Sequence, residues 1–286
     1  MDRCLVATAF DKQIRIYIAD TTALVNEAAR IHKTIKTATA AFGRFLTITG
    51  MMGLMLKMDE TITTRISCDG PIEYMLAVAN AHGDVKGDIL NGNVYLVNEK
   101  NKLDVGKAIG KGTLSIAKDF SLREPFTSQV SLVSGEIAED FVQYYMKSEQ
   151  IPTSISLGVL VDEKVRQAGG FIVQVMPNCD EAVIDIIENN ILHLKPFSTL
   201  LEEGFSLEDI LSAISSGEHE ILEEKVLKYH CDCSKERYAL SLARLDSDSL
   251  MELSSDEQLE IICNFCKKQV YFSKEEVQQI INKTSK

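Results

Sequence analysis

The chain of 286 residues carries 42 acidic and 30 basic residues, a formal net charge of −12, and 45% of its residues are hydrophobic. This length exceeds one typical domain and is enough for two or three folded units. The negative charge disfavours non-specific binding to nucleic acid, because phosphates repel it.

The first twenty residues contain no basic leader followed by an apolar stretch and a cleavage site, so we expect a cytoplasmic, reducing compartment. Residues 37–56, "TATAAFGRFLTITGMMGLML", are long enough to cross a membrane. They nevertheless carry Arg44 near their middle, three glycines and four threonines. The composition therefore predicts a helix buried in a protein core and no membrane partner.

Residues 1–178 show mixed strand patterns. Ile14, Ile16 and Ile18 alternate with polar neighbours, as a half-buried strand requires. Between residues 61 and 97, turn signals such as Asp69-Gly70 separate short runs, which indicates an antiparallel meander. The runs "SISLGVLV" and "GGFIVQVM" predict two further strands that close this unit.

Helix patterns lie among these strands. Thr21 or Thr22 can cap one helix, and the small residues after Ala38 predict a second. A third is expected to begin at Ser134 and to end before Pro152. Residues 1–178 are thus predicted to form an α+β domain.

Residues 179–230 differ in charge, because positions 180–230 hold 12 acidic and only 3 basic residues. Asp180 can cap one short helix, and Ser206 with Asp209 offers a capping box for another. Short helices with like charges are marginal alone, so we expect a helical linker that is ordered only when its neighbours brace it. Pairing of its carboxylates with basic residues of the core is the alternative.

Residues 231–286 hold four of the seven cysteines, Cys231 and Cys233 in a CxC, and Cys263 and Cys266 in a CxxC. Short pairs let one turn present two sulfurs, and four sulfurs suit tetrahedral zinc. These residues therefore predict a small zinc-binding domain that holds one Zn²⁺ per chain. Four cysteines already fill the shell, so His230 is expected beside the metal or as a bystander.

The surroundings of both pairs favour this interpretation. Ser234 can cap a helix that runs to Leu245, and the CxxC lies between the strand-like runs "LEII" and "QVYF". Ser273 and Glu276 then form a capping box for a last helix. The pattern predicts a zinc-knuckle hairpin that leads into a helix.

Rival interpretations of the cysteines fit less well. A thioredoxin-like dithiol should open a helix, whereas Cys266 precedes the strand-like "KKQVYF". Four unrelated buried thiols would not be expected to form two closely spaced pairs. The other three cysteines, Cys4, Cys68 and Cys179, are interpreted as packed, unreactive thiols.

Two other motifs carry little chemistry. The stretch "GKAIGKGT" from Gly106 is not a phosphate-binding loop. Three residues rather than four separate Gly106 from Gly110, and Gly112 stands where that motif has the Ser or Thr that binds magnesium. Glu136, Glu139 and Asp140 are expected in a solvated first helical turn. No set of nucleophile, base and oxyanion donors emerges, so no enzyme is predicted.

The sequence resembles the heat shock protein 33 family of bacterial redox-regulated chaperones. The resemblance rests on the two cysteine motifs and on "SCDGP", "GDVKGDI", "VGKAIGKGTL", "SGEIAEDFVQYYMKSEQIPTSISLGVLV", "AGGFIVQVMP" and "CDCSKER". It extends over almost the whole chain in order, with Lys86 where the family usually has Arg.

The resemblance implies a substrate-binding domain over 1–178, a linker over 179–230 and a zinc-binding redox switch over 231–286. It implies a holdase that binds unfolding client proteins without ATP. The resemblance further implies that the protein is inactive when it is reduced and zinc-bound, and that it is active as a homodimer when its four switch cysteines are oxidised to disulfides. A zinc-ribbon nucleic-acid module and a thiol oxidoreductase are the alternatives. The first would require a basic face, whereas residues 231–286 hold 8 basic and 10 acidic residues.

Overall fold

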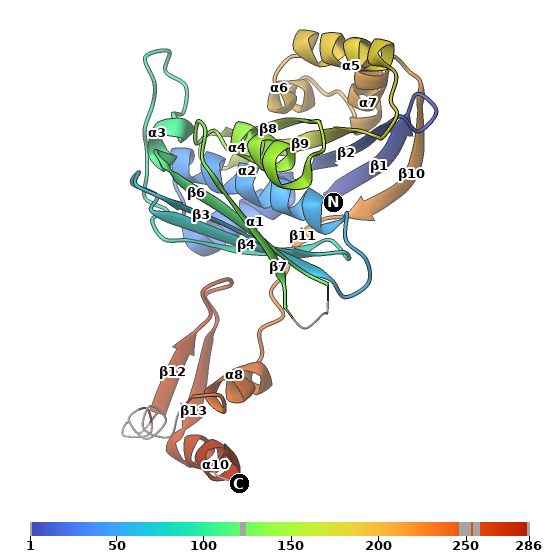
Figure 1. Ribbon diagram of the computed structural model, residues 1–286. Helices are drawn as coiled ribbons and strands as arrows, with labels where there is room; N and C mark the ends of the chain where they lie inside the picture. Colours follow the sequence, from blue (N-terminus) through green and yellow to red (C-terminus); the bar gives the residue numbers. More distant parts are fainter. Residues whose placement is uncertain (1, 121–123, 246–252, 254–257, 285–286) are drawn as a thin grey trace. The chain divides into compact units, whose positions relative to one another are not determined.

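The structure is a computed structural model that describes residues 2–120, 124–245, 253 and 258–284 (Figure 1). The chain folds as two compact units, Met1–His230 and Cys231–Lys286. Both strands and helices build each unit, so the predicted α+β class is confirmed.

The first sheet of the larger unit has five antiparallel strands. Their order is β10 (His219–Val226), β1 (Arg3–Ala9), β2 (Ile14–Asp20), β9 (Val165–Val175) and β8 (Thr153–Val161). The predicted strand with Ile14, Ile16 and Ile18 is confirmed as β2, and all three side chains are fully buried. They lie on the face that the helices of residues 180–215 cover, as alternation along a strand requires.

The second sheet has six strands. Their order is β11 (Lys228–Tyr229), β5 (Asp84–Ile89), β4 (Tyr74–Asn80), β3 (Thr61–Cys68), β6 (Gly112–Asp119) and β7 (Phe126–Ser131). β3, β4 and β5 are antiparallel neighbours, which confirms the predicted meander. β11 pairs with β5 in parallel. The last residue of β10, Val226, lies so close to the turn at Gly83 that a Cβ there would collide with its carbonyl oxygen.

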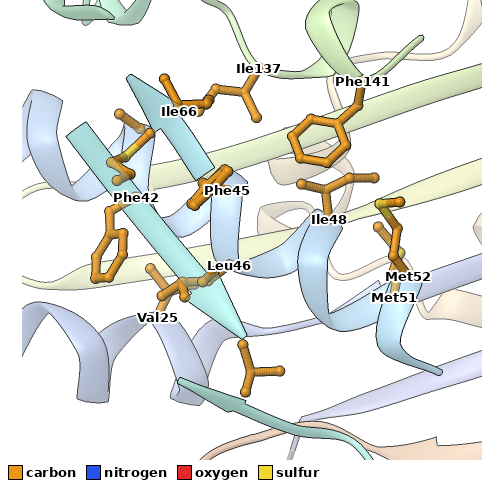
Figure 2. Packing of buried hydrophobic residues seen from close by; sticks show 14 of the residues in the cluster. Val25, Phe42, Phe45, Leu46, Ile48, Met51, Met52, Ile66, Ile137 and Phe141 are labelled. Atoms are coloured by element: carbon orange, nitrogen blue, oxygen red, sulfur yellow. The ribbon is translucent and has the colours of Figure 1, made fainter. Parts of the chain in front are cut away.

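Helix α2 (Lys36–Gly53) fills the space between the two sheets, and nearly every residue of it is buried. Figure 2 shows Phe42, Phe45 and Leu46 of this helix packed among residues from other elements. Arg44 of α2 is paired with Glu136 at 2.6 Å. Among the described residues, no helix is long and apolar enough to cross a membrane.

Helix α1 (Thr22–His32) begins where the sequence predicts, but neither threonine caps it with its side chain. The Asp2 carboxylate instead accepts hydrogen bonds from the backbone N–H groups of Ala23 and Leu24. The Thr21 hydroxyl is buried against Thr47. A residue near the chain's start thus supplies the cap, which local sequence cannot reveal.

The predicted helix after Ser134 is shorter than expected. It consists of α4 (Ala138–Tyr144) and a π-helical turn, η1 (Tyr145–Glu149). A separate short helix, α3 (Val105–Ile109), lies earlier in the chain, before β6. The expectation that Asp140 is solvated is wrong. Its side chain is fully buried and accepts four backbone N–H bonds, from residues 133, 134, 135 and 137.

Residues 180–215 form the expected helices, α5 (Glu181–His193), α6 (Phe197–Glu202) and α7 (Leu207–Ser215). They cover one face of the five-stranded sheet (Figure 1). Ser206 and Asp209 form the predicted capping box of α7. Residues 219–226 differ from a purely helical linker, because they extend as β10 along the open edge of β1.

Several acidic side chains of this segment are paired with basic residues. Arg3 contacts Glu208 at 2.8 Å and Glu224 at 3.6 Å, and Lys195 contacts Glu203 at 2.7 Å. The two pairs of Arg3 support the alternative in which the core neutralises part of the acidic segment, whereas Lys195 belongs to the segment itself. These pairs are largely exposed, so each contributes only about 0–1 kcal/mol.

The smaller unit contains α8 (Lys235–Leu242), β12 (Gln258–Ile262), β13 (Gln269–Ser273) and α10 (Lys274–Thr284). The Ser234 hydroxyl caps α8, and Ser273 with Glu276 forms the capping box of α10, both as predicted. The helix α8 ends at Leu242, three residues earlier than expected. Among the described residues, the core of this unit is small, and its buried members are Leu242, Val270, Phe272, Val277 and Ile281.

Candidate metal centre

The CxC lies immediately before α8. Because Ser234 caps the helix, the chain is extended up to that residue and turns there, so Cys231 and Cys233 lie at the amino end of α8. The Arg237 side chain reaches back to the Asp232 carboxylate, between the two cysteines. Local capping therefore fixes the position of this pair.

The CxxC forms the tip of the β12–β13 hairpin. The Cys263 N–H donates to the carbonyl of Lys268 at 2.9 Å, and the Lys267 N–H donates back to the Cys263 carbonyl at 2.8 Å. Lys267 adopts a positive φ of 58°, which lets the chain reverse at this point. The tight turn brings both sulfurs of this pair to one side.

The four sulfurs meet in space. Sγ atoms of Cys231, Cys233, Cys263 and Cys266 all lie within 4.8 Å of one another. Across the pairs, Cys231 lies 3.7 Å from Cys263, and Cys233 lies 3.3 Å from Cys266. A zinc ion about 2.3 Å from each sulfur needs sulfur separations of about 3.8 Å in a tetrahedron. The donor set and its spacing therefore fit Zn²⁺, as the sequence predicts.

The acidities of these thiols differ. Burial raises the pKa of Cys231 to about 12, and hydrogen bonding to neighbouring thiols adds to this. Burial also opposes ionisation of Cys263, but hydrogen bonds from Tyr238 and from the backbone N–H groups of Cys266 and Phe265 outweigh it and lower the pKa to about 6. Cys263 is therefore the member of the cluster most readily present as a thiolate, the form that binds metals and reacts with oxidants.

Two contacts of this centre have no clear signal in the sequence. Tyr238 lies one turn into α8, at a position that the helical pattern assigns only to packing. The Lys235 ammonium contacts the Glu276 carboxylate at 2.6 Å and so joins α8 to α10. Both contacts depend on how the elements pack.

The remaining cysteines do not join the cluster. Cys4 is fully buried, and burial raises the pKa of its thiol to about 12. Cys68 and Cys179 are partly exposed, and burial raises the pKa of each. His230 also lies outside the group of four sulfurs, and its N–H pairs with the Val85 carbonyl of β5. Within the described ranges, these four cysteines form the one such group of metal-ligating residues.

Comparisons with known proteins agree with this picture. The Hsp33 protein family matches residues 2–273. The chain is 42% identical over 291 residues to the 33 kDa chaperonin of Bacillus subtilis, with both chains covered completely. It is 43% identical over 285 residues to the 33 kDa chaperonin of Geobacillus kaustophilus, which covers 98% of this chain and 97% of that protein.

Among solved structures, the crystal structure of the 33 kDa chaperonin (heat shock protein 33 homolog) from Thermotoga maritima matches with a TM-score of 0.91. The two are 36% identical, and the match covers 99% of this chain and 98% of the other. The resemblance noted in the sequence is thereby confirmed. The chain belongs to the Hsp33 family, and its function is that of a chaperone that binds client proteins.

Proposed function

We propose that this protein is a redox-regulated holdase that binds unfolding proteins under oxidative stress without ATP and without catalysing a reaction. The observation that carries this proposal is the convergence of four sulfurs within 4.8 Å in a unit with a small core. Cysteines in such a cluster serve both as metal ligands and as an oxidant sensor.

In the reduced protein, Cys231, Cys233, Cys263 and Cys266 would hold one Zn²⁺. Bound zinc would join the amino end of α8 to the hairpin tip and so contribute folding free energy to a unit with few buried side chains. The pairing of Lys235 with Glu276 acts in the same direction but is exposed. The cysteine ligands therefore account for most of the unit's stability in this proposal.

Oxidation removes these ligands. One thiolate attacks a peroxide oxygen, which breaks the O–O bond, yields a sulfenic acid and releases hydroxide that takes up a proton to form water. A second thiolate then attacks the sulfenic sulfur, so that an S–S bond forms and the S–O bond breaks, and the hydroxide that leaves takes up a proton to form a second water. Each disulfide thus consumes one peroxide and two thiols. Two such events convert all four sulfurs, and none remains as a thiolate ligand.

The segment 179–230 connects this event to client binding in the proposal. It ends at His230, directly before the first switch cysteine. Its helices cover an apolar sheet face that includes Ile16, Ile18 and Phe171, with Leu211 and Ile214 of α7 packed on it. Unfolding of the smaller unit would release one end of the segment, and the uncovered face would bind apolar parts of clients.

The remaining parts of the proposal concern setting and assembly. We expect the protein to work in the cytoplasm, where thiols stay reduced until stress oxidises them. We expect the active form to be a homodimer. We expect no nucleic-acid partner, because residues 231–286 carry no excess of basic residues.

The decisive experiment measures light scattering during aggregation of a chemically denatured globular protein. The reduced, zinc-loaded protein should leave aggregation unchanged, and protein treated with peroxide should suppress it in the absence of ATP. A matched control replaces Cys179, which lies outside the cluster, by Ser and should behave like the wild type. Equal suppression by the reduced and oxidised forms would contradict redox regulation, and turnover of small disulfides would favour a thiol oxidoreductase.

A further inference from the structure

A cavity of about 370 Å³ lies in the larger unit, and none of its lining residues is a cysteine. It is bounded by the carboxyl end of α2, by β2 and β9 of the first sheet, by the end of β6 and by the π-helical turn η1. Figure 2 shows one of its lining residues, Met52, near the end of α2. The cavity therefore forms where the two sheets and the central helix meet.

Arg15 of β2 lines this cavity without a charge partner. Its side chain is half-buried, and no carboxylate of the described residues lies within 4 Å of it. Its Nε and Nη2 donate to the Gln174 Oε1 at 3.2 and 2.7 Å, which leaves Nη1 unused. The guanidinium also lies over the Tyr17 ring, at 6.0 Å from its centroid, which leaves its positive charge uncompensated by a carboxylate. An anion in the cavity could therefore accept a charge-assisted hydrogen bond from it.

Gln174 of β9 supplies a second unused donor. The guanidinium can only donate, so the amide must direct its oxygen toward Arg15 and its nitrogen away from it. The side chain is fully buried, and its Nε2 has no acceptor within the described part of the chain. A buried amide nitrogen without an acceptor costs about 1–3 kcal/mol, so an acceptor supplied by a ligand would stabilise this arrangement.

Two lysines, Lys57 and Lys118, also line the cavity, and Lys118 is already engaged. Lys118 contacts Glu149 at 2.7 Å, and Glu149 also accepts a hydrogen bond from Tyr144. Glu149 lies in the π-helical turn η1 and lines the cavity, and such turns often accompany functional sites. This carboxylate and Glu60 would repel a dianion such as phosphate, so the cavity favours a single negative charge.

The rest of the wall is apolar and deformable. Met52, Met55 and Phe120 line it, and methionine adapts to ligands of irregular shape. We propose that this cavity binds a monocarboxylate carried on an apolar chain, with the carboxylate at Arg15 and Gln174 and the chain against the methionines. The carboxylate can belong to a free alkanoic acid or to the C-terminus of an apolar peptide. This site is independent of the cysteine cluster.

The test follows the methyl NMR signals of ¹³C-labelled methionines in the reduced full-length protein. Octanoate should shift the Met52 and Met55 signals in a saturable way and leave the exposed Met58 unchanged. Acetate, which lacks the chain, and 1-octanol, which lacks the charge, should each bind at least tenfold more weakly. Binding of 1-octanol as tight as that of octanoate would contradict the role of Arg15, and saturable shifts confined to Met58 would place the site elsewhere.

Variants sharpen the assignment. Arg15→Met should weaken octanoate binding at least tenfold, and Lys12→Met, which removes an exposed positive charge in the β1–β2 turn, should change it less than twofold. Equal affinities of both variants would overturn the proposal. If Arg15→Met fails to fold, the comparison of octanoate with 1-octanol and acetate on the wild type still shows whether binding needs both the charge and the apolar chain. Trileucine with a free C-terminus and trileucine with an amidated C-terminus are then tested as competitors of octanoate. Displacement of octanoate by the free form alone would identify a peptide C-terminus as a source of the carboxylate.

Discussion

The side chains of His32 and Tyr229 meet inside the larger unit, with 3.0 Å between the histidine Nε2 and the tyrosine hydroxyl, although 197 residues separate them. The hydroxyl donates to the Gly87 carbonyl at 2.9 Å, so its single proton is engaged and His32 must donate to it. Tyr229 is the last residue of β11 and lies two positions before Cys231. This contact therefore anchors the chain just ahead of the CxC pair.

We expect Tyr229→Phe to loosen this anchor. The change leaves polar groups of His32 and Gly87 without the hydroxyl, which should lower the free energy of unfolding by about 2 kcal/mol. Urea unfolding measures the loss, and hydrogen exchange should show faster exchange around residues 226–230. Tyr271→Phe, which removes an exposed hydroxyl in the smaller unit, is the matched control. Equal effects of both changes on residues 226–230 would contradict the anchoring role.

The ion pair of Glu149 predicts a dependence of stability on pH. Burial opposes ionisation of Glu149, but hydrogen bonds from Lys118 and Tyr144 outweigh it and hold its pKa below the ordinary value of 4.5. A carboxylate with a lowered pKa stabilises the fold fully above about pH 4.5 and loses this contribution as the pH falls through the lowered pKa.

Glu149→Gln should therefore cost about 1–2 kcal/mol at pH 7, and this cost should shrink as the pH falls below 4.5 and through the lowered pKa. Urea unfolding of the wild type and the variant at pH 7, 5, 4 and 3 gives the difference directly. Glu139→Gln, which changes a carboxylate of the neighbouring helix α4, serves as the control. A constant difference between wild type and Glu149→Gln across this range would show that the carboxylate charge does not stabilise the fold.

Each of the four clustered cysteines should be needed for zinc. Structural zinc sites contribute roughly 10–16 kcal/mol in total, so one sulfur accounts for roughly 2.5–4 kcal/mol. Replacing any one of Cys231, Cys233, Cys263 and Cys266 by Ser should thus weaken zinc binding about a hundredfold or more. Competition with a chromophoric chelator measures the affinity, with Cys179→Ser as the control. Wild-type affinity in one of the four variants removes that residue from the ligand set.

Oxidation should link Cys231 to Cys233 and Cys263 to Cys266. Members of each pair are at most three positions apart, whereas a bond between the pairs must close a loop across 29 residues after the metal is lost. In the reduced fold the sulfurs also approach across the pairs, at 3.7 and 3.3 Å, so cross-linked products are the specific alternative. Peptide mapping of the oxidised protein distinguishes the two patterns, and predominant bonds between the pairs would refute this assignment.

The segment 179–230 should become less ordered on oxidation. If unfolding of the smaller unit releases it, amide exchange should rise in α5–α7 and β10 while β3 and β4 stay protected. Hydrogen exchange of the reduced and oxidised forms, read by mass spectrometry, tests this. Unchanged protection of the segment would exclude its release as the switch, even if the oxidised protein suppresses aggregation.

The structure also changes an expectation about charge in this segment. Glu202, Glu203, Glu223 and Glu224 all lie within salt-bridge distance of a basic residue. Neutralising them would therefore remove weak attractions as well as repulsion. The acidic composition alone does not determine whether the segment is held or released.

The sequence by itself determined the features that depend on neighbours within a few residues. The spacing of the cysteines, the alternation of Ile14, Ile16 and Ile18, and the capping boxes at Ser206 and Ser273 are all local patterns. A helix cap or a strand face is specified by contacts over three or four positions, so these predictions agree with the structure. The family resemblance rests on the same local motifs in their order along the chain.

Only the tertiary structure decided which distant groups meet. Asp2 caps α1, the buried Asp140 binds a loop, and β10 extends beside β1. The unpaired Arg15 and the donor of Gln174 likewise come together from two strands. Such contacts join residues whose separation in sequence carries no periodic signal, because the packing of whole sheets and helices sets their distance. Local patterns therefore predict the elements and the metal ligands, whereas the cavity at Arg15 emerges only when the two sheets enclose α2.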